Sequence, residues 1–427
     1  MSKIHMVGIG GIGMSALAQF FLHKGKSITG SDRGEFPTTK LLKEKGIPVV
    51  IGDGEIPEGT EILIYSDAYR EDNKERIKAR SLGIPECSYF EALGEISKNY
   101  FTITVSGTHG KTTTTGMLGK ILVDSGFSPT IIVGSILKDF DSNFVAGEDI
   151  LVVEGCEYMD NLLNLDTDML VITNIELDHP DYFDNLEHVQ RTFRKAVEQL
   201  PKDGKVVVNL GEENIKSVIE GISENRIIDY SQTEIVDLLL IGDFNKENAK
   251  AAKTAALAYK HSPEGIEERI DMSLSLFKGT WRRFEYIGKT KNGAVVYDDY
   301  AHHPTEIKVT LNATREKFPD KKITIVFYPH LHSRTKAFFN EFRDELSKAD
   351  NIIVAPIYKA RKEDTNGVSS ELLVEKIKEK NKQVFYFEDT DKIIEHLDRN
   401  TSEGDIIITM GAGDNYKIGG KIICTKT

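Results

Sequence analysis

The segment Val105 to Thr113, VSGTHGKTT, constrains the fold of this chain more than any other stretch of its 427 residues. It follows an apolar, strand-like run, Tyr100 to Thr104, and precedes a helix-like run, Thr114 to Val123. Glycines in this context let main-chain amides surround phosphate oxygens, Lys111 supplies a positive charge for the β and γ phosphates, and the Thr112 hydroxyl can bind Mg²⁺. The segment therefore predicts a nucleoside triphosphate loop and the use of ATP.

The glycine spacing of this loop departs from the general phosphate-loop pattern. That pattern is G-x-x-x-x-G-K-[ST], with four residues between its two glycines. Here only Thr108 and His109 separate Gly107 from the Gly110-Lys111 pair, which gives a compressed G-T-H-G-K-T-T. The alternative to a phosphate loop is a glycine turn between strand and helix with an exposed lysine.

Length and charge limit the class of protein further. A chain of 427 residues, 40% hydrophobic and 28% charged, is too long for one hydrophobic core, so we expect two or three domains. The net charge is −13 and no long basic run is present, so the backbone of a nucleic acid would be repelled on average. We therefore expect no nucleic-acid partner.

The cysteines and the apolar runs indicate the compartment. Cys87, Cys156 and Cys424 are odd in number, lie far apart and form no CxxC pair, which favours a reducing environment over a zinc site or a disulfide framework. No run approaches 18 consecutive apolar residues, and the start of the chain enters a strand at once, without a signal peptide. The sequence thus predicts a cytoplasmic protein with no membrane insertion.

Apolar strand-like runs alternate with helix-length segments along the chain, which is typical of parallel sheets covered by helices. The first series is Ile4 to Val7, Ile62 to Tyr65, Phe101 to Val105, Ile150 to Val153, Met169 to Thr173 and Val206 to Asn209. The second series, after Gly288, is Ala294 to Tyr297, Ile323 to Phe327, Asn351 to Ala355, Gln383 to Phe387 and Asp405 to Met410. We predict an α/β protein of three domains: a Rossmann-like N-terminal domain (1–98), a central phosphate-loop ATPase-type domain (99–287) and a C-terminal Rossmann-like α/β domain (288–427).

The first predicted domain carries a second glycine motif directly after a strand. Its G-x-G-x-x-G spacing lets a diphosphate approach a helix N-terminus, and Asp32 ends the next strand-like run about twenty residues on. The motif residues are Gly8, Gly10, Gly11 and Gly13. This geometry suits any pyrophosphate, including that of a UDP-sugar, so NAD binding stays open, as does a turn or capping role for Asp32.

Two further residues of the central domain suit a metal–nucleotide site. Glu154 ends the apolar strand Asp149 to Val153, which places its carboxylate at the sheet edge beside the phosphate loop, where it can hold Mg²⁺. His179 is expected to end the next strand at the same edge. Magnesium prefers oxygen ligands, so chemistry alone favours His179 less than Glu154.

At this point the chain resembles the Mur ligase family, over essentially its whole length. The motifs occur in the family's order: GTHGKTT, the strand-end Glu154, NIELDH ending in His179, Asn245 and Asn248 in GDFNKENAKAA, GTWRR ending in Arg283, and DDYAHHP from Asp298 to Pro304. Four details, GIGGIGMSALA, DDYAHHPTEI, YPHLHSRT from Tyr328 and GAGDNYKIG from Gly411, resemble the branch that joins the first amino acid to a nucleotide sugar.

The resemblance implies ATP-dependent synthesis of an amide bond through an acyl phosphate, with L-alanine joined to UDP-N-acetylmuramate in peptidoglycan precursor synthesis. The alternatives are the sister branch that adds a free murein tripeptide to the same nucleotide sugar, and a related ligase with another acceptor. A dinucleotide-dependent oxidoreductase, which would use only the first domain, is the distant alternative, and a nucleotide-binding regulator without turnover is another.

The resemblance also implies a role for particular residues. Lys111 would neutralise the β and γ phosphates, while Asn245 and Asn248 would meet adenine, and Asp299 the ribose. Arg283 would reach the γ phosphate, with Arg282 able to share this task. The implied ATP-binding set is Gly107, Thr108, His109, Gly110, Lys111, Thr112, Thr113, Asn245, Asn248, Arg283, Asp299 and His302.

The remaining implied residues concern the metal and the other substrates. Thr112 and Glu154 would hold one Mg²⁺ and His179 a second. His302, His330 and Arg334 would face the sugar carboxylate and the amino acid. The implied catalytic set is Lys111, His179, Arg283, His330 and Arg334, and the UDP-sugar set is Gly8, Gly10, Gly11, Gly13, Asp32 and Ser66.

Substrate-side segments depart from the family pattern more than ATP-side segments do. Ile84 to Leu93 lacks the arginine pair expected after Ile-Pro, Gly52-Asp53 stands where Gly-His is usual, and His332 replaces a tyrosine. We therefore expect the contacts with the nucleotide sugar to differ from the family pattern more than the contacts with ATP do.

Overall fold

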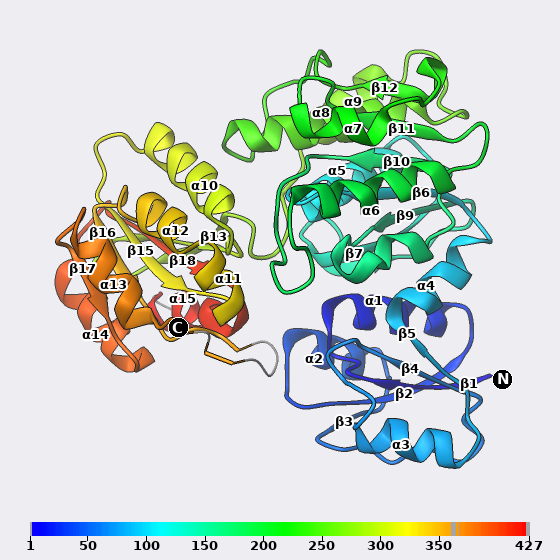
Figure 1. Ribbon diagram of the computed structural model, residues 1–427, viewed down its shortest axis with the longest axis horizontal. Coiled ribbons are helices and arrows are strands. Elements are labelled where there is room, and N and C mark those ends of the chain that lie inside the picture. Colours follow the sequence, from blue (N-terminus) through cyan, green and yellow to red (C-terminus); the bar gives the residue numbers. More distant parts are fainter. Residues whose placement is uncertain (1, 360–363, 366, 424–427) are drawn as a thin grey trace. The chain divides into compact units, whose positions relative to one another are not determined.

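The computed structural model describes residues 2–359, 364–365 and 367–423, so Cys424 lies outside the described residues. These residues build three β-sheets (Figure 1). They divide into two compact units, which are described separately: one of residues 1–176, 187–239 and 247–278, the other of residues 177–186, 240–246 and 279–427. The predicted α/β class is confirmed.

The first sheet is fully parallel, in the order β3-β2-β1-β4-β5. Its strands are β1 (Lys3–Val7), β2 (Ser27–Asp32), β3 (Val49–Ile51), β4 (Ile62–Tyr65) and β5 (Glu86–Ser88). Its helices are α1 (Ile12–His23), α2 (Pro37–Glu44), α3 (Lys74–Ser81) and α4 (Tyr89–Ser97). The chain leaves β1 and β4 toward opposite edges, so the loop after β1 opens at the switch point, where open α/β sheets bind ligands.

The second sheet has the order β12-β11-β10-β6-β9-β7-β8, parallel except for the β7–β8 pair. Its strands are β6 (Phe101–Ser106), β7 (Pro129–Leu137), β8 (Ser142–Val145), β9 (Ile150–Glu154), β10 (Met169–Ile172), β11 (Lys205–Val208) and β12 (Ile227–Asp229). The helices that follow in the chain are α5 (Lys111–Asp124), α6 (Leu186–Gln199), α7 (Lys216–Ile219), α8 (Asp243–Ala258) and α9 (Glu267–Ser275), with short 3₁₀ turns at Tyr158–Asn164, Glu213–Ile215 and Glu224–Arg226.

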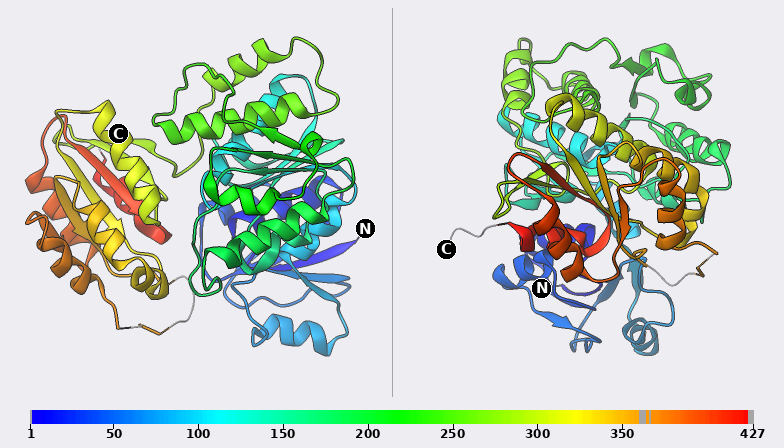
Figure 2. Two further views of the ribbon diagram at one scale, coloured as in Figure 1. Left: turned by 45° about the horizontal axis from the view of Figure 1, so that its top comes forward. Right: turned by 90° about the vertical axis from the view of Figure 1, so that its left-hand side faces the viewer.

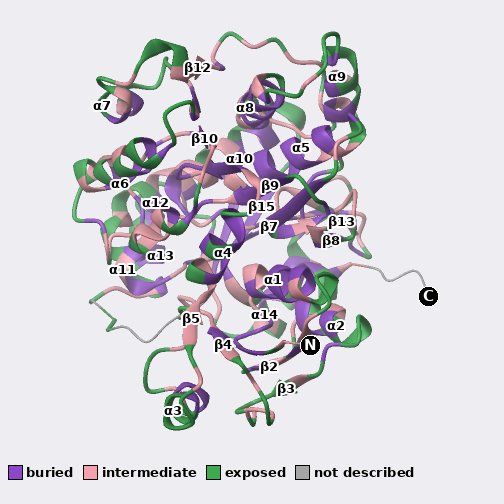
Figure 3. Cartoon of the chain, turned by 90° about the vertical axis from the view of Figure 1, so that its right-hand side faces the viewer, coloured by how far each residue is buried: buried purple, intermediate pink, exposed green. Residues whose placement is uncertain are grey.

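Helices α5 and α6 cover opposite faces of the second sheet. The buried side chains of α6 include Val189, Phe193, Ala196 and Val197, an apolar stripe at helical spacing. Helix α5 is buried over most of its length and also packs against α9 (Figure 3). The chain leaves β6 toward one edge of this sheet and β10 toward the other. The carboxyl ends of these two neighbouring strands therefore form the switch point of the sheet.

A buried amide joins the first two sheets within their compact unit. Asn143, in β8, has no exposed surface; its Nδ2 donates to the Ile12 carbonyl at 2.6 Å and to the Ser15 hydroxyl at 2.9 Å. Its Oδ1 accepts from Gln19 Nε2 at 2.8 Å, and the Ser142 hydroxyl donates to Gln19 Oε1 at 3.2 Å. Helix α1, whose first turn contains the last glycine of the motif, is thus held against β7 and β8.

Asn143→Ala is expected to lower the free energy of unfolding by about 2 kcal/mol, because buried donors and acceptors lose their partners. Urea unfolding followed by circular dichroism measures the change. Asn143→Asp serves as the matched variant: it keeps the shape but turns a carboxylate toward the Ile12 carbonyl, so it should destabilise the protein at least as much. Unchanged unfolding of both variants would contradict the role of this clamp.

The third sheet, in the second unit, has the order β13-β14-β18-β15-β16-β17, with only β13 antiparallel to its neighbour. Its strands are β13 (Glu285–Lys289), β14 (Val295–Asp299), β15 (Ile323–Tyr328), β16 (Asn351–Val354), β17 (Val384–Tyr386) and β18 (Ile406–Gly411). Its helices are α10 (Pro304–Lys317), α11 (His332–Ala337), α12 (Phe339–Leu346), α13 (Ser370–Lys378), α14 (Thr390–Asn400) and α15 (Tyr416–Ile422), with a 3₁₀ turn at Gly413–Asn415.

Both faces of the third sheet are covered, as Figure 2 shows. Along β15, Ile325 and Phe327 point into a core with α10, α12 and α13, whereas Val326 points into a second core with α14 and α15. This alternation follows from the two-residue period of a strand. Strand β13 spans position 287, where a domain boundary was predicted, and the second unit resumes at Gly279. The three-domain division itself stays a prediction.

Candidate active site

The predicted phosphate loop joins β6 to α5 at the switch point of the second sheet. Gly107 and Gly110 have φ angles of 131° and 83°, and α5 begins at Lys111. A Cβ at Gly107 would collide with the Thr173 hydroxyl, and one at Gly110 with the Asn248 amide. Both positions therefore require glycine for conformation and for space, which explains why the compressed motif keeps these two glycines.

Lys111 folds back over its own loop. Its Nζ donates to the carbonyls of Gly107 and Thr108 and to Glu157, whose two carboxylate oxygens lie at 3.0 and 3.2 Å. Burial opposes the charge, but the neighbouring Glu157 carboxylate holds the pKa of Lys111 above its ordinary value. The sequence did not single out Glu157; its only signal was its place three residues after Glu154.

Oxygen ligands gather at the neighbouring strand end. Glu154 is the last residue of β9, and one of its carboxylate oxygens accepts from the Thr112 hydroxyl at 3.1 Å. Its other carboxylate oxygen accepts from the amide of Gly134. A hydroxyl and a carboxylate in contact beside a phosphate loop fit the oxygen preference of Mg²⁺. The structure thus brings Thr112 and Glu154 together as predicted.

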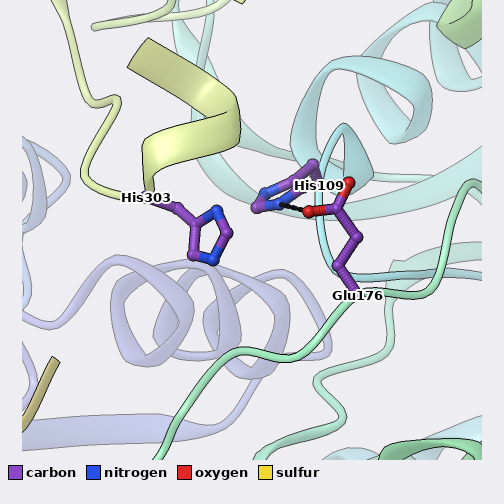
Figure 4. Close-up of side chains that lie close together, drawn as sticks. All are labelled: His109, Glu176 and His303. Carbon is purple, nitrogen blue, oxygen red and sulfur yellow. Dashed lines mark ion pairs between the residues drawn. The ribbon is translucent and has the colours of Figure 1, made fainter. Parts of the chain in front are cut away.

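The segment after β10 supports the phosphate loop from the side. Asn174 accepts from the amide of His109 at 2.9 Å through its side chain and from the amide of Thr108 at 3.0 Å through its carbonyl. Nε2 of His109 lies 3.7 Å from a carboxylate oxygen of Glu176, the ion pair drawn in Figure 4. These contacts hold the middle of the loop, and the sequence did not reveal them.

The expectation that His179 ends the strand after Glu154 is wrong. Strand β10 ends at Ile172, because the next residues turn to bond the phosphate loop through Thr173 and Asn174. His179 has a φ of 52° and belongs to residues 177–186 of the second unit. Its role as a metal ligand stays a prediction.

The two predicted adenine residues fall in different units. Asn248, in α8, lies beside Gly110 of the phosphate loop. Asn245, in the first turn of the same helix, is buried within residues 240–246 of the second unit, where its Nδ2 donates to the Ile241 carbonyl at 2.8 Å.

The first sheet assembles the predicted nucleotide-sugar loop. Asp32, at the end of β2, accepts from the amide of Gly10 at 2.7 Å. A Cβ at Gly8 would lie 2.6 Å from the Tyr69 ring and 3.0 Å from Cβ of Ser66. Gly11 caps the N-terminus of α1, whose first turn carries no acidic side chain. The structure therefore gathers this predicted set around the N-terminus of α1, where backbone amides favour an anion. The set is Gly8, Gly10, Gly11, Gly13, Asp32 and Ser66.

A buried ion pair organises the catalytic candidates of the second unit. Arg334 is 1% exposed and binds Asp178 through two parallel hydrogen bonds of 2.9 Å. Burial alone would raise the pKa of the Asp178 carboxyl, but the Arg334 guanidinium holds the pKa of Asp178 well below its ordinary value. Arg334 also bonds Nδ1 of His330, whose ring stacks on Tyr358 with centroids 6.1 Å apart.

His302 lies next to this group, its ring 5.4 Å from that of His330. Burial lowers the pKa of His302 to about 4, although Glu306 opposes the shift. The imidazole is therefore neutral at neutral pH and able to accept a hydrogen bond. The structure brings His302, His330 and Arg334 together as the sequence predicted.

Arg282 and Arg283 have different surroundings. Arg282 is 4% exposed, and its guanidinium donates to Asp298 at 2.8 Å, to the carbonyls of Gly413 and Gly411 at 2.8 and 2.7 Å, and to Asn415. It is therefore neither a solvated charge nor free to share the task of its neighbour. Its φ of 60° shows that these bonds hold a strained turn. Arg283 is partly exposed, 3.7 Å from Glu306.

Asp299 gives a pH-dependent prediction. Burial raises its pKa from 3.8 to about 6, although the Thr310 hydroxyl donates to it at 2.7 Å. The folded protein therefore keeps a proton that the unfolded chain releases between pH 4 and 6. The free energy of unfolding should fall by about 3 kcal/mol from this group as the pH rises through that window. Urea unfolding at pH 4 and pH 7 measures this change, and Asp299→Asn should lose about 3 kcal/mol less than the parent protein over that range. An equal decrease in the free energy of unfolding in the parent protein and in Asp299→Asn would contradict the prediction.

The fold and the site define a class: an α/β protein with a phosphate loop, a strand-end carboxylate suited to Mg²⁺ and a second glycine loop suited to a diphosphate. Three family profiles match the chain: Mur ligase family, catalytic domain, at residues 3–101; Mur ligase middle domain at 105–238; and Mur ligase, glutamate ligase domain, at 282–413.

Curated relatives and solved structures agree. UDP-N-acetylmuramate–L-alanine ligases of Caldicellulosiruptor saccharolyticus and Acetivibrio thermocellus are 39% and 38% identical, over 98% and 97% of this chain and 97% and 94% of theirs. The crystal structure of the UDP-N-acetylmuramate–alanine ligase of Thermotoga maritima has a TM-score of 0.81 at 26% identity, covering 99% of this chain and 98% of its own. A murein peptide ligase of Psychrobacter arcticus shares the fold, with a TM-score of 0.74 at 21% identity, covering 99% and 98%.

The chain belongs to the Mur ligase family, as the ordered motifs predicted. None of the helices in the described part of the chain combines the length and the apolar character that crossing a membrane needs.

Proposed function

We propose that the protein is an ATP-dependent ligase that joins L-alanine to the carboxylate of UDP-N-acetylmuramate in peptidoglycan precursor synthesis. The observation that carries this is similarity over nearly the whole length, 39% identity across 98% of the chain, to a protein named for that reaction. The phosphate loop, with Lys111 in place for phosphate oxygens, supports the use of ATP.

In the proposed reaction, an oxygen of the substrate carboxylate attacks the γ phosphorus of ATP, and ADP leaves. The amine nitrogen of alanine then attacks the carbonyl carbon of the acyl phosphate, loses a proton to solvent, and inorganic phosphate leaves as the amide forms. Phosphoryl transfer of this kind is governed by positioning and charge neutralisation.

The first unit supplies the groups that we assign to the triphosphate and to one Mg²⁺. Loop amides from Gly107 to Lys111 would bind phosphate oxygens, and the Lys111 ammonium would exchange Glu157 for the β and γ phosphates. Thr112 and Glu154 would hold Mg²⁺, which supplies positive charge to the phosphates. His179, which belongs to the second unit, is assigned to a second Mg²⁺ by family resemblance alone.

The second unit supplies groups of three kinds in this proposal. Arg283 has a planar, partly exposed guanidinium suited to the γ phosphate, and Asp299 is assigned to the ribose. His302, His330 and Arg334 form one connected cluster and are assigned to the sugar carboxylate and the amino acid. We propose domains of residues 1–98, 99–287 and 288–427 for the nucleotide sugar, for ATP, and for completing the ATP and amino-acid sites.

The experiment is phosphate release from ATP and Mg²⁺ with UDP-N-acetylmuramate, with and without each of alanine, glycine and serine, with the product followed by mass spectrometry. We expect release that requires alanine, a mass gain of one alanine residue, and loss of turnover on chelation of Mg²⁺. Turnover only with a free peptide would move the assignment to the murein-tripeptide reaction. Silence with every acceptor would refute the proposal, and NAD reduction would favour the oxidoreductase alternative.

A further inference from the structure

Tyr89 occupies a position between the two ligand loops of the first unit that no motif assigns. It is the first residue of α4 and follows Ser88, whose side chain caps the helix by accepting from the amide of Glu91. Because Ser88 also ends β5, Tyr89 stands at the carboxyl edge of the first sheet, where the glycine loop opens.

The phenol end of Tyr89 covers Gly13 in the first turn of α1. A Cβ at Gly13 would lie 2.7 Å from Cζ and 2.8 Å from the hydroxyl oxygen of Tyr89. The hydroxyl is therefore held at the helix N-terminus, where unpaired amides favour an anion. Gly13 is needed because any larger residue would displace the ring.

The same ring lies close to the phosphate-loop side of the unit. Burial raises the pKa of the Tyr89 hydroxyl, and the nearby Glu154 carboxylate and Cys156 raise it further. The phenol therefore keeps its proton at physiological pH and acts as a donor. Among the described residues, none forms a hydrogen bond with this hydroxyl.

We propose that the Tyr89 hydroxyl donates a hydrogen bond to the diphosphate of the nucleotide sugar, at the junction between the glycine loop and Glu154. This inference rests on the proposed function. A donor suits this place because the Glu154 carboxylate on one side would repel an unscreened phosphate, while the α1 N-terminus on the other attracts it. The position falls in the segment from Ile84 to Leu93, where the sequence lacks the expected arginine pair, so a neutral donor stands in a segment expected to be basic.

The test is Tyr89→Phe, which keeps the ring over Gly13 and removes only the hydroxyl. Calorimetry on the full chain without ATP should show about a tenfold weaker affinity for both UDP and UDP-N-acetylmuramate, as expected for a lost hydrogen bond to a charged group. Affinity for uridine, which has no diphosphate, should stay the same. Under the ligation assay, KM for the nucleotide sugar should rise about tenfold while KM for ATP and kcat stay within twofold.

Tyr100→Phe is the matched control. Its ring also packs on α1, but at the other end of the helix, beside Phe20 and Lys24, so neither affinity should change. Equal binding of UDP by the parent protein and Tyr89→Phe would overturn the inference, as would a loss seen with UDP-N-acetylmuramate but not with UDP. Failure of the parent protein to bind either nucleotide would refute the proposed function and this inference with it, a result distinguishable from equal binding by both proteins.

Discussion

Lys111→Ala is expected to lower kcat for ligation by about 10³-fold, because it removes the ammonium that we assign to neutralising the triphosphate during phosphoryl transfer. It should also lower the free energy of unfolding by about 3 kcal/mol, since Glu157 is only 2% exposed and loses its cation. Phosphate release and urea unfolding measure the two effects.

The two effects of Lys111 can be separated with a second substitution. Lys111→Ala combined with Glu157→Gln removes the buried charge, so most of the stability should return while turnover stays low. Recovery of activity together with stability would show that Lys111 acts only by holding the fold. Glu157→Gln alone should leave the protein folded and able to bind ATP.

Arg334→Ala is expected to have the largest effect on stability, a loss of about 3–5 kcal/mol, because Asp178 would remain buried and charged without its guanidinium. Urea unfolding followed by tryptophan fluorescence is suited to this measurement, since the single tryptophan, Trp281, lies in the same unit. Turnover should also be lost, because Arg334 no longer contacts His330 in the cluster that we assign to the substrates.

Two comparisons sharpen this prediction. Arg399→Ala breaks an exposed ion pair with Glu395, one turn away on α14, and should leave the unfolding midpoint nearly unchanged. Arg334→Met with Asp178→Asn removes both buried charges and should recover much of the stability, but not turnover. If Arg334→Ala unfolded like Arg399→Ala, the ion pair would not organise this unit.

The sequence predicted what depends on local pattern. Strand Ile62–Tyr65 matches its predicted bounds, and the helix after the phosphate loop extends its predicted range by only a few residues, because apolar runs and glycine punctuation act over short distances. Thr112 and Glu154 were paired correctly because carboxyl ends of parallel strands share one edge.

What the sequence did not predict depends on contacts between distant residues. Arg282 could be taken for a solvated charge because its partners, Gly411 and Asn415, come more than one hundred residues later. Asn143 carries no motif, and its value as a clamp arises only when β8 meets α1. His179 was wrongly predicted to end a strand. Strand β10 ends at Ile172 because Thr173 and Asn174 bond the phosphate loop, and no local sequence pattern indicates those contacts.

The Arg334–Asp178 pair has a consequence for how such chains can be recombined. Asp178 lies 156 residues before its partner, in a short segment that the chain inserts between β10 and α6. A chimera that exchanges residues 279–427 between two family members would separate the pair unless residues 177–186 were exchanged as well. Crossover points that transfer residues 177–186, 240–246 and 279–427 together should yield folded hybrids, whereas a single cut near 278 should yield aggregates. The second compact unit is therefore built from segments that are separate in the sequence, although they fold together.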